Sequence, residues 1–345
     1  MSLCVLVTGA AGQDGAYLCR DLLSAGCTVH AGLRPGWNDD ALWRLRELDL
    51  LGHPGLHLLA LDVRDASACD TAVARVHPDQ LFHLAARSSV AQAQADPLDA
   101  IACNGNGAVH LFEAARRHVP AARIVLASSA EIFAPRDGVI DETCAWQARH
   151  PYAVSKLMAH AALHAYRDTY GLQASAAILF NHESPLRGNA FVTRKIAAAA
   201  ARRAAGSTDV LYLGNLDARR DFGYAPDYVV ALSALARRAE PDDFVIASGR
   251  QASIREFATL AFAAAGIALD WHGSGLGEHA VDAGNGGRCI AVDPALLRRV
   301  DAPMLRGDAA RARRELGLTD SVDTAGLAAL LVAAERRRLA RGTPA

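Results

Sequence analysis

The stretch that most constrains the fold lies at the N-terminus, where a short apolar run leads into three closely spaced glycines. Residues 3–7 are predicted to form a buried strand, and a helical pattern follows through Leu22 and ends at Gly26. Glycines between a strand and a helix permit a tight turn and let a pyrophosphate approach the free N–H groups of the helix. A glycine triplet alone also fits an ordinary loop, but this strand–turn–helix context favours a dinucleotide-binding turn. The three glycines are Gly9, Gly12 and Gly15.

Strands and helices are expected to alternate as far as residue 180. This pattern predicts an α/β fold of the Rossmann type, a doubly wound parallel sheet with helices on both faces. The 345 residues, 51% of them hydrophobic, suffice for a large core in one two-lobed unit or two domains. A helix over 98–118 is interrupted near Asn104, which we expect to contact a strand rather than to cap the helix. Further strands are expected at 28–33, 56–61, 80–85 and 123–127.

Composition argues against several functional classes. The formal net charge is -1 and no basic stripe occurs, so nucleic-acid binding is not expected. No apolar run is long enough to span a bilayer, and the N-terminus lacks a charged leader and a cleavage site. The seven cysteines are scattered singly without a CxxC pair, which predicts neither a metal site nor a disulfide framework. We expect a cytoplasmic enzyme with reduced thiols and no membrane partner.

A tyrosine and a lysine four residues apart form the first candidate catalytic pair. Pro151 suits the first turn of a helix, so Tyr152 and Lys156 share one face of it. A phenol titrates near pH ~10, and a neighbouring cation lowers that pKa until the pair can move a proton near neutrality. Taken alone, the pair equally fits a surface tyrosine beside a solvated lysine.

A second candidate group follows the strand over 123–127. Ser129 and Glu131 come directly after it, and the carboxyl ends of parallel strands face the ligand crevice. Singly, the serine fits a helix cap and the glutamate a solvated loop acid. Together, ahead of Tyr152 and Lys156, they predict a hydroxyl, a carboxylate, a phenol and an ammonium in one site.

The second expected strand carries the cofactor preference. An NAD enzyme usually has an acidic residue near the end of this strand to bind the ribose 2′-hydroxyl. Arg34 stands there instead, and a guanidinium suits a 2′-phosphate, so we predict NADP. The alternative is a solvated arginine at a strand end. Asp62, at the end of the third strand, can accept a hydrogen bond from the adenine amino group.

Together these features resemble the extended short-chain dehydrogenases/reductases and, within them, the GDP-mannose 4,6-dehydratase family. The similarity extends from residue 5 to about 308, and its most specific blocks lie in the centre of the chain. The matching blocks are Thr8-Gly9 with Gly12-Gln13-Asp14-Gly15, Asn181-His182-Glu183-Ser184-Pro185, Phe191-Val192-Thr193-Arg194-Lys195, Tyr212-Leu213-Gly214-Asn215-Leu216-Asp217 and Arg220-Asp221.

The resemblance implies a redox-neutral dehydration of GDP-mannose. Tyr152, assisted by Lys156, takes the C4 hydroxyl proton while NADP+ takes the C4 hydride. Glu131 then removes the acidified C5 proton, the C6 hydroxyl leaves as water, and the hydride returns to C6. Ser129 stands where the family usually has threonine, and its hydroxyl is expected to aid proton transfer at O4.

The motifs and the resemblance together predict the site residues. Cofactor contacts are expected from Gly9, Gly12, Gln13, Asp14, Gly15, Arg34, Asp62, Val63, Leu84, Ala85, Ala86, Ser88, Tyr152, Lys156, His182 and Arg187. Contacts to the GDP-sugar are expected from Ser88, Asn181, Glu183, Ser184, Val192, Lys195, Leu213, Gly214, Arg220, Arg298 and Asp301.

The chain departs from the family at a few positions. Residues 34–37 read Arg-Pro-Gly-Trp, where the family has an Arg-Arg-Ser-Ser-like run that crosses to a neighbouring subunit. Arg87 replaces a glutamine, and Asp301 stands where the family usually has glutamate. A homodimer or homotetramer is still expected. The departures leave open a related sugar such as a GDP-manno-heptose, and the rivals are a nucleotide-sugar reductase or epimerase and a catalytically silent homologue.

The resemblance also implies a division into lobes. Residues 1–180 and 221–247 are expected to bind the cofactor, and 181–220 and 248–345 the nucleotide sugar. The glycine-rich stretch 273–287 is predicted to be a mobile loop. A last helix over about 323–340 carries three consecutive arginines, at 336–338, which we expect on a solvated face.

Overall fold

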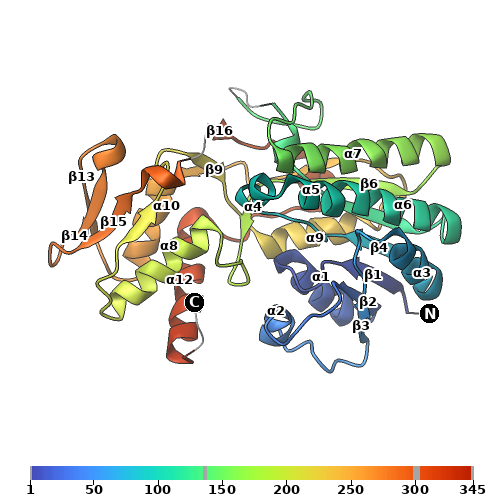
Figure 1. Ribbon diagram of the computed structural model, residues 1–345, viewed down its shortest axis with the longest axis horizontal. Helices are drawn as coiled ribbons and strands as arrows, with labels where there is room; N and C mark the ends of the chain where they lie inside the picture. The colour runs from blue at the N-terminus through green and yellow to red at the C-terminus, as the bar shows by residue number, and fades with distance from the viewer. Residues whose placement is uncertain (1, 135–137, 298–303, 343–345) are drawn as a thin grey trace.

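The protein has two lobes that lie side by side (Figure 1). The computed structural model describes residues 2–134, 138–297 and 304–342. The larger lobe carries the N-terminus and is built on a parallel sheet, whereas the smaller lobe carries the last helix and short mixed sheets.

A seven-stranded sheet forms the centre of the larger lobe, with the order β11-β6-β5-β4-β1-β2-β3 and every pair parallel. The order reverses at β1, and in such sheets the crevice for ligands opens at the carboxyl ends of the strands near this reversal. The strands predicted from the apolar runs are confirmed to within one or two residues. They are β1 Cys4–Thr8, β2 Thr28–Leu33, β3 Leu56–Ala60, β4 Gln80–His83 and β5 Arg123–Ser129. Two strands whose bounds were not predicted, β6 Ala174–Leu179 and β11 Phe244–Ile246, complete the sheet.

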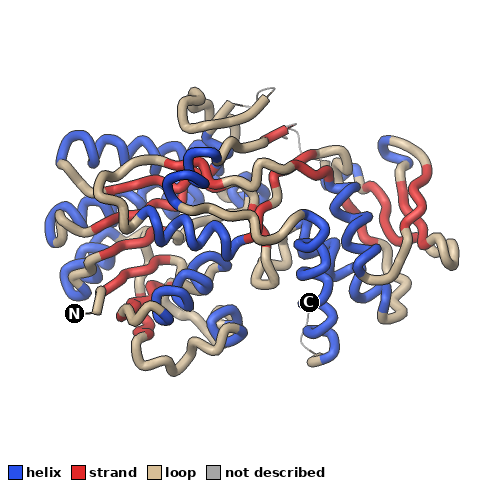
Figure 2. Tube along the Cα trace, turned by 180° about the vertical axis from the view of Figure 1, so that it is seen from behind, coloured by secondary structure: helices blue, strands red, loops and turns tan. Residues whose placement is uncertain are grey.

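Helices cover both faces of this sheet, as the alternation predicted (Figures 1 and 2). In β1, Val5 and Val7 point into one core and Leu6 into the other, which is the period of two expected for a strand buried on both faces. No helix within the described ranges is both long enough and apolar enough to cross a bilayer. The helices are α1 Gln13–Ser24, α9 Ala225–Leu235 and α11 Ala310–Leu316 on one side, and α3 Ala66–Val76, α6 Gly107–His118 and α7 Pro151–Tyr170 on the other.

The interrupted helix is a continuous one with a π-helical turn in it. Pro97–Ala100 (α5) runs into a π-helix, Ile101–Asn106, and then into α6. Such turns recur at functional sites. Here the turn aims Asn104 at the end of β4, where its Oδ1 accepts from the Arg87 N–H at 2.7 Å. Its Nδ2 donates to Ser155 Oγ at 2.9 Å. The predicted contact of Asn104 with a strand is therefore wrong, since Asn104 links its helix to the loop after β4 and to α7.

The smaller lobe packs three helices against a four-stranded sheet of order β13-β14-β15-β8. Two short sheets, β12-β9-β16 and β10-β7, join it to the larger lobe. The helices are α8 Val192–Ala204, α10 Ile254–Ala264 and α12 Thr324–Ala340. The strands are β7 His182–Glu183, β8 Leu211–Leu213, β9 Arg219–Asp221, β10 Gly223–Tyr224, β12 Gln251–Ser253, β13 Leu269–His272, β14 His279–Asp282, β15 Arg288–Val292 and β16 Met304–Leu305. The larger lobe also carries two short helices, α2 Trp43–Glu47 and α4 Val90–Ala95.

Two predictions for this lobe are wrong. The stretch 273–287 is not a loop throughout, because β14 lies within it and pairs with β13 and β15. Its glycines serve the turns, with positive φ at Gly273, Gly275 and Gly286. The arginines 336–338 are not all solvated, since Arg338 is buried and donates to the Pro185 carbonyl and the Glu335 carboxylate.

Candidate active site

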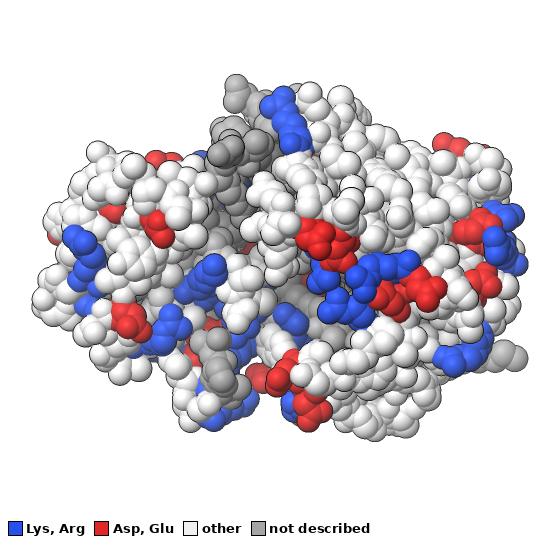
Figure 3. Space-filling view, in the orientation of Figure 1, with Lys and Arg blue, Asp and Glu red and all other residues white. Residues whose placement is uncertain are grey.

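A cavity of about 1260 Å³ opens at the carboxyl ends of the central strands and extends between the lobes. Basic side chains gather along the boundary between the lobes on the face shown in Figure 3. Every site residue predicted from the sequence and described by the structure lines this cavity, with the exception of Ser184. Arg298 and Asp301 lie outside the described residues.

The glycine turn tolerates no side chain. Gly9 has φ +70°, and a Cβ there would lie 2.7 Å from the Ala85 nitrogen. A Cβ on Gly15 would lie 2.3 Å from the Gly9 carbonyl oxygen, so α1 packs directly on the turn. Gly12 stands at the N-cap of α1 without a side-chain hydrogen bond. The first N–H groups of α1 therefore face the cavity as a preformed anion site.

A buried ion pair flanks the glycine turn. His182 donates from Nδ1 to the Phe180 carbonyl at 2.6 Å, and its Nε2 lies 2.9 Å from Asp14 Oδ2. Burial lowers the pKa of His182, but the Asp14 carboxylate outweighs burial and raises it above the ordinary value. Burial raises the pKa of Asp14, and the His182 charge reverses this and lowers it. The pair ties α1 to β7 at the junction of the two lobes.

The predicted proton-transfer pair is buried at the floor of the cavity. Lys156 Nζ donates to the Ala127 carbonyl at 2.8 Å, and burial lowers the pKa of Lys156 to about 8. Burial raises the pKa of Tyr152 to about 12, although a hydrogen bond with Ser129 works in the opposite direction and the Glu131 carboxylate adds to the rise. In the protein alone, the net pKa shift of the phenol is thus opposite to the one expected from Lys156. Desolvation of the phenolate is the largest cause of this rise.

Glu131 lies in a short 3-10 turn, Ala130–Ile132, directly after β5. Its backbone N–H donates to Ser129 Oγ at 3.3 Å, which fixes the turn. One carboxylate oxygen, Oε2, lies 3.1 Å from Nε2 of His150, a residue that the sequence did not single out. The signal was present, because His150 directly precedes Pro151 and so occupies the N-cap of the next helix.

The predicted sugar-binding residues divide into two groups. Glu183 and Ser184 are buried supports: Glu183 Oε2 accepts from Thr193 Oγ1 at 2.5 Å and pairs with Arg187 at 3.0 Å. Ser184 donates to Gln13 Oε1 at 2.8 Å, which explains why it does not line the cavity. Glu183 also reaches the cavity wall, and Ser88 lines the cavity from the larger lobe. The other described residues of the set face the cavity from the smaller lobe and its junction, namely Asn181, Val192, Lys195, Leu213, Gly214 and Arg220.

Comparison with known proteins places this geometry in a family. The sequence model described as "GDP-mannose 4,6 dehydratase" matches residues 6–330. A relative named GDP-mannose 4,6-dehydratase, from Sinorhizobium fredii (strain HH103), is 36% identical over 344 residues, covering 98% of this chain and 97% of the relative. One of the same name from Vibrio cholerae serotype O1 is 36% identical over 353 residues, with 96% and 92% covered.

The chain belongs to the GDP-mannose 4,6-dehydratase family. Solved structures show the same fold. A UDP-glucose 4-epimerase from Thermus thermophilus, in complex with NAD, matches with TM-score 0.77 and 24% identity over 96% of this chain and 98% of that one. The protein RMD from Pseudomonas aeruginosa, complexed with NADPH, matches with TM-score 0.76 and 22% identity over 98% and 100%. At these identities the likeness concerns the fold alone.

The rim of the cavity in this family member is built from exposed charges. Arg34 is exposed at the end of β2, as predicted. Asp62, the predicted adenine partner, is held by Arg64 at 2.6 Å, and Arg64 also contacts Asp99 at 2.8 Å. Arg87 donates to the same Asp99. Arg64 was not predicted from the sequence, where its place two residues after Asp62 is the signal.

A second residue that the sequence did not predict, Arg44, supports the glycine turn. Arg44, on α2, donates to the Leu186 carbonyl at 2.7 Å and to the Ala11 carbonyl at 3.0 Å. Burial lowers its pKa to about 10, and the nearby Arg194 adds to this shift. The guanidinium stacks on Trp43, which Arg338 of α12 also contacts. Basic side chains from both lobes thus meet around one indole.

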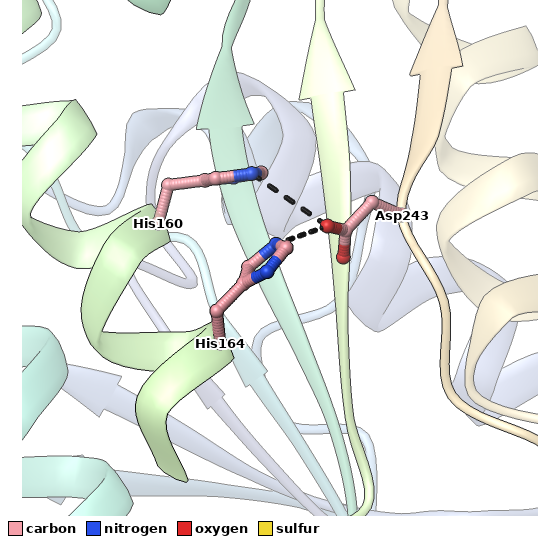
Figure 4. A group of neighbouring side chains, drawn as sticks. All are labelled: His160, His164 and Asp243. Atoms are coloured by element: carbon pink, nitrogen blue, oxygen red, sulfur yellow. Dashed lines mark hydrogen bonds and ion pairs between the residues drawn. The ribbon is translucent and has the colours of Figure 1, made fainter. Parts of the chain in front are cut away.

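A further polar group joins α7 to the segment just before β11 (Figure 4). His160 and His164 of α7 both direct Nε2 toward Asp243 Oδ2, at 3.6 and 2.5 Å. The residue types suit a metal ion, but the Arg167 guanidinium lies 3.0 Å from the same carboxylate. Ser128 Oγ holds His160 Nδ1 at 3.0 Å. The hydrogen bond between Ser128 and His160 ties α7 to β5, and the contacts of His164 and Arg167 with Asp243 tie α7 to the start of β11.

Proposed function

We propose that the protein catalyses the NADP-dependent, redox-neutral dehydration of GDP-mannose to GDP-4-keto-6-deoxymannose. The observation that carries this proposal is the position of Glu131, a carboxylate on the same strand end as Ser129 and close enough to Tyr152 to raise the pKa of its phenol. Hydride transfer alone needs no such carboxylate. Removal of a C5 proton does. The family relatives named above bear the name of this activity.

The residues of the cavity fit a nicotinamide dinucleotide. The uncapped N-terminus of α1 and the side-chain-free surface of Gly9 and Gly15 suit a pyrophosphate. Exposed guanidinium groups at the ends of β2 and β3 suit a 2′-phosphate, so we favour NADP over NAD. When bound, this cofactor would supply a hydride acceptor for C4 and a hydride donor for C6.

The protein's own groups handle the protons. The ammonium of Lys156 stabilises the phenolate of Tyr152, and this phenolate, with Ser129 beside it, takes the proton of the C4 hydroxyl. Glu131 removes the C5 proton that the new 4-ketone acidifies, and returns it to C5 after the C6 hydroxyl has left. The proton taken from the C4 hydroxyl balances the one that leaves in water, so the reaction releases one water and no net reducing equivalent.

The smaller lobe is assigned to the GDP-sugar. Lys195 and Arg220 line the cavity and suit the diphosphate, and Leu213 with Gly214 suits the base. A Cβ on Gly214 would lie 2.5 Å from the Leu296 carbonyl oxygen, so the wall there is backbone. We assign residues 1–180 and 221–247 to cofactor binding and 181–220 and 248–345 to the sugar nucleotide, in a chain that acts as a homodimer or homotetramer. Within this division, β11 returns to the seven-stranded sheet.

Mass spectrometry of GDP-mannose after incubation with the purified protein and a catalytic amount of NADP+ tests the proposal. Loss of one water without net cofactor reduction is the expected result. Net reduction of the cofactor, or an inverted sugar with no mass change, would instead indicate a reductase or an epimerase. An unchanged sugar nucleotide would contradict GDP-mannose as the substrate, and a GDP-manno-heptose would then be the next compound to test.

A further inference from the structure

We propose that His150 is a positioning residue for Glu131, holding the carboxylate in the orientation from which it removes the C5 proton. This inference rests on the proposed function for the role of Glu131. His150 does not line the cavity, so it acts through Glu131 rather than on the substrate.

The hydrogen bonds of His150 define its tautomer. Its Nδ1 accepts from the Ala153 backbone N–H at 3.2 Å, as the N-cap of α7. A ring nitrogen that accepts a hydrogen bond carries no proton, so the proton of the neutral ring lies on Nε2. That Nε2–H points at Glu131 Oε2 from 3.1 Å. The ring is therefore fixed as a donor to the carboxylate without needing to be charged.

Backbone contacts fix the two residues relative to each other. The Gln147 N–H donates to the Ile132 carbonyl at 2.8 Å, and Phe133 forms an antiparallel bridge with Trp146. These contacts fasten the segment before α7 to the turn that carries Glu131. The imidazole of His150 also stacks on the ring of Tyr152, with centroids 6.2 Å apart and planes 11° apart. Both side chains are mostly buried, at 11% exposure for His150 and 22% for Glu131.

The arrangement has two chemical consequences. A donor to a carboxylate favours its charged form, so His150 keeps Glu131 ready to accept a proton and helps it give that proton back. It also limits rotation of the carboxylate, and small errors in the placement of a base slow proton transfer strongly. C4 oxidation depends on Tyr152 and Lys156, and it should not depend on this bond.

His150→Asn separates the two roles of the histidine. Asparagine is a good N-cap, so its Oδ1 can still accept from the Ala153 N–H, but its shorter side chain cannot also reach Glu131. His118→Asn is the matched control, because His118 forms a similar pair with Asp70 at 2.9 Å on α6, away from the cavity. The measurements are cofactor reduction in a single turnover, deuterium exchange at C5 in D2O, and water loss by mass spectrometry.

In His150→Asn we expect C5 exchange and water loss to slow about 10- to 100-fold, with C4 oxidation and KM nearly unchanged. His118→Asn should behave as the wild type does. Unchanged C5 exchange in His150→Asn would reduce His150 to a helix cap and overturn the inference. Equal losses in both chemical steps would also overturn it, since they would indicate a general structural defect.

A titration that is independent of turnover separates this inference from the proposed function. The protein is labelled with 13C at glutamate carboxyls, and Glu131→Gln identifies the Glu131 signal by its loss. Two titratable side chains face this carboxyl from α7 and its N-cap, namely Tyr152 and His150. Only His150 differs between the wild type and His150→Asn. The carboxyl pKa of Glu131 should rise in His150→Asn. An unchanged pKa would overturn the inference, whereas a raised pKa in a protein that dehydrates nothing would overturn the proposed function alone.

Discussion

The floor and the rim of the cavity use charge in different ways. At the floor, Tyr152 and Lys156 are 8% and 6% exposed, and burial shifts the pKa of each away from its ordinary value. At the rim, Arg34 is exposed, and the Arg64 side chain is 38% exposed, so the ion pairs of Arg64 are in contact with solvent. Interactions between buried charges are strong and poorly screened, while exposed pairs contribute little and weaken with salt. Chemistry is thus expected to depend on the floor and selectivity on the rim.

The largest effect should come from the floor. Lys156→Met leaves a similar volume but removes the cation beside Tyr152, and we expect kcat to fall by about 1000-fold or more. Lys195→Met is the contrasting variant, since Lys195 faces the proposed diphosphate site and its loss should raise KM more than it lowers kcat. Steady-state kinetics on the two variants checks this. If the two variants lost kcat to a similar extent, catalysis would depend no more on the floor than on the proposed diphosphate site.

Glu131→Gln separates the two chemical steps that depend on the floor. The amide keeps the shape of the side chain but cannot take a proton, so water loss should fall by about 100- to 10,000-fold. Partial transfer of the C4 hydride should persist, because Tyr152 and Lys156 are intact. Rapid-mixing absorbance of the cofactor and mass spectrometry of the sugar separate the two steps. Full dehydration by this variant would refute the mechanism.

His83, buried next to the floor, should make the stability of the protein sensitive to acid. It is buried next to Lys156, and burial lowers its pKa to about 3, with the ammonium adding to the shift. Stability is then complete above pH ~6.5, the ordinary pKa of histidine, and falls as the pH drops toward 3, because the unfolded chain binds a proton that the folded one excludes. The expected loss is a few kcal/mol.

Denaturant unfolding of the wild type and of His83→Gln between pH 7 and pH 4 measures this effect. The variant should lose less stability over the interval, since glutamine does not titrate. The exposed His53→Gln serves as the control and should follow the wild type. Parallel pH curves for all three proteins would show that His83 is not the cause.

The same division explains what the sequence could predict. Residues at the floor follow from local rules, because Tyr152 and Lys156 share a helix face and Ser129 with Glu131 ends a parallel strand. Five of the seven strands of the large sheet, β1 to β5, followed from apolar runs, which are also a local pattern. The family resemblance, which comparison with known proteins confirms, predicted most of the residues that line the cavity from the smaller lobe.

Pairings between distant segments could not be predicted. Ser184 turns to Gln13, 171 residues away in the chain, and so leaves the cavity wall. Arg338 is buried against the Pro185 carbonyl, 153 residues away, although three consecutive arginines are typical of a solvated face. Stretch 273–287 forms a strand because two neighbours complete its hydrogen bonds. In each case tertiary contact overrides a local pattern that indicated otherwise.

The smallest effect is expected at the rim, where Arg34→Ala should weaken NADP+ binding by about 5- to 10-fold and leave NAD+ binding nearly unchanged. The preference for NADP+ should thereby disappear. Because the guanidinium is exposed, added salt should shrink the difference between the wild type and the variant, whereas the defect of Lys156→Met should persist. Titration calorimetry with both cofactors at low and high ionic strength measures this. Equal affinities for the two cofactors in the wild type would rule out Arg34 as the selective residue. If added salt left the binding defect of Arg34→Ala unchanged, the charges of the rim would be no more screened by solvent than those of the floor.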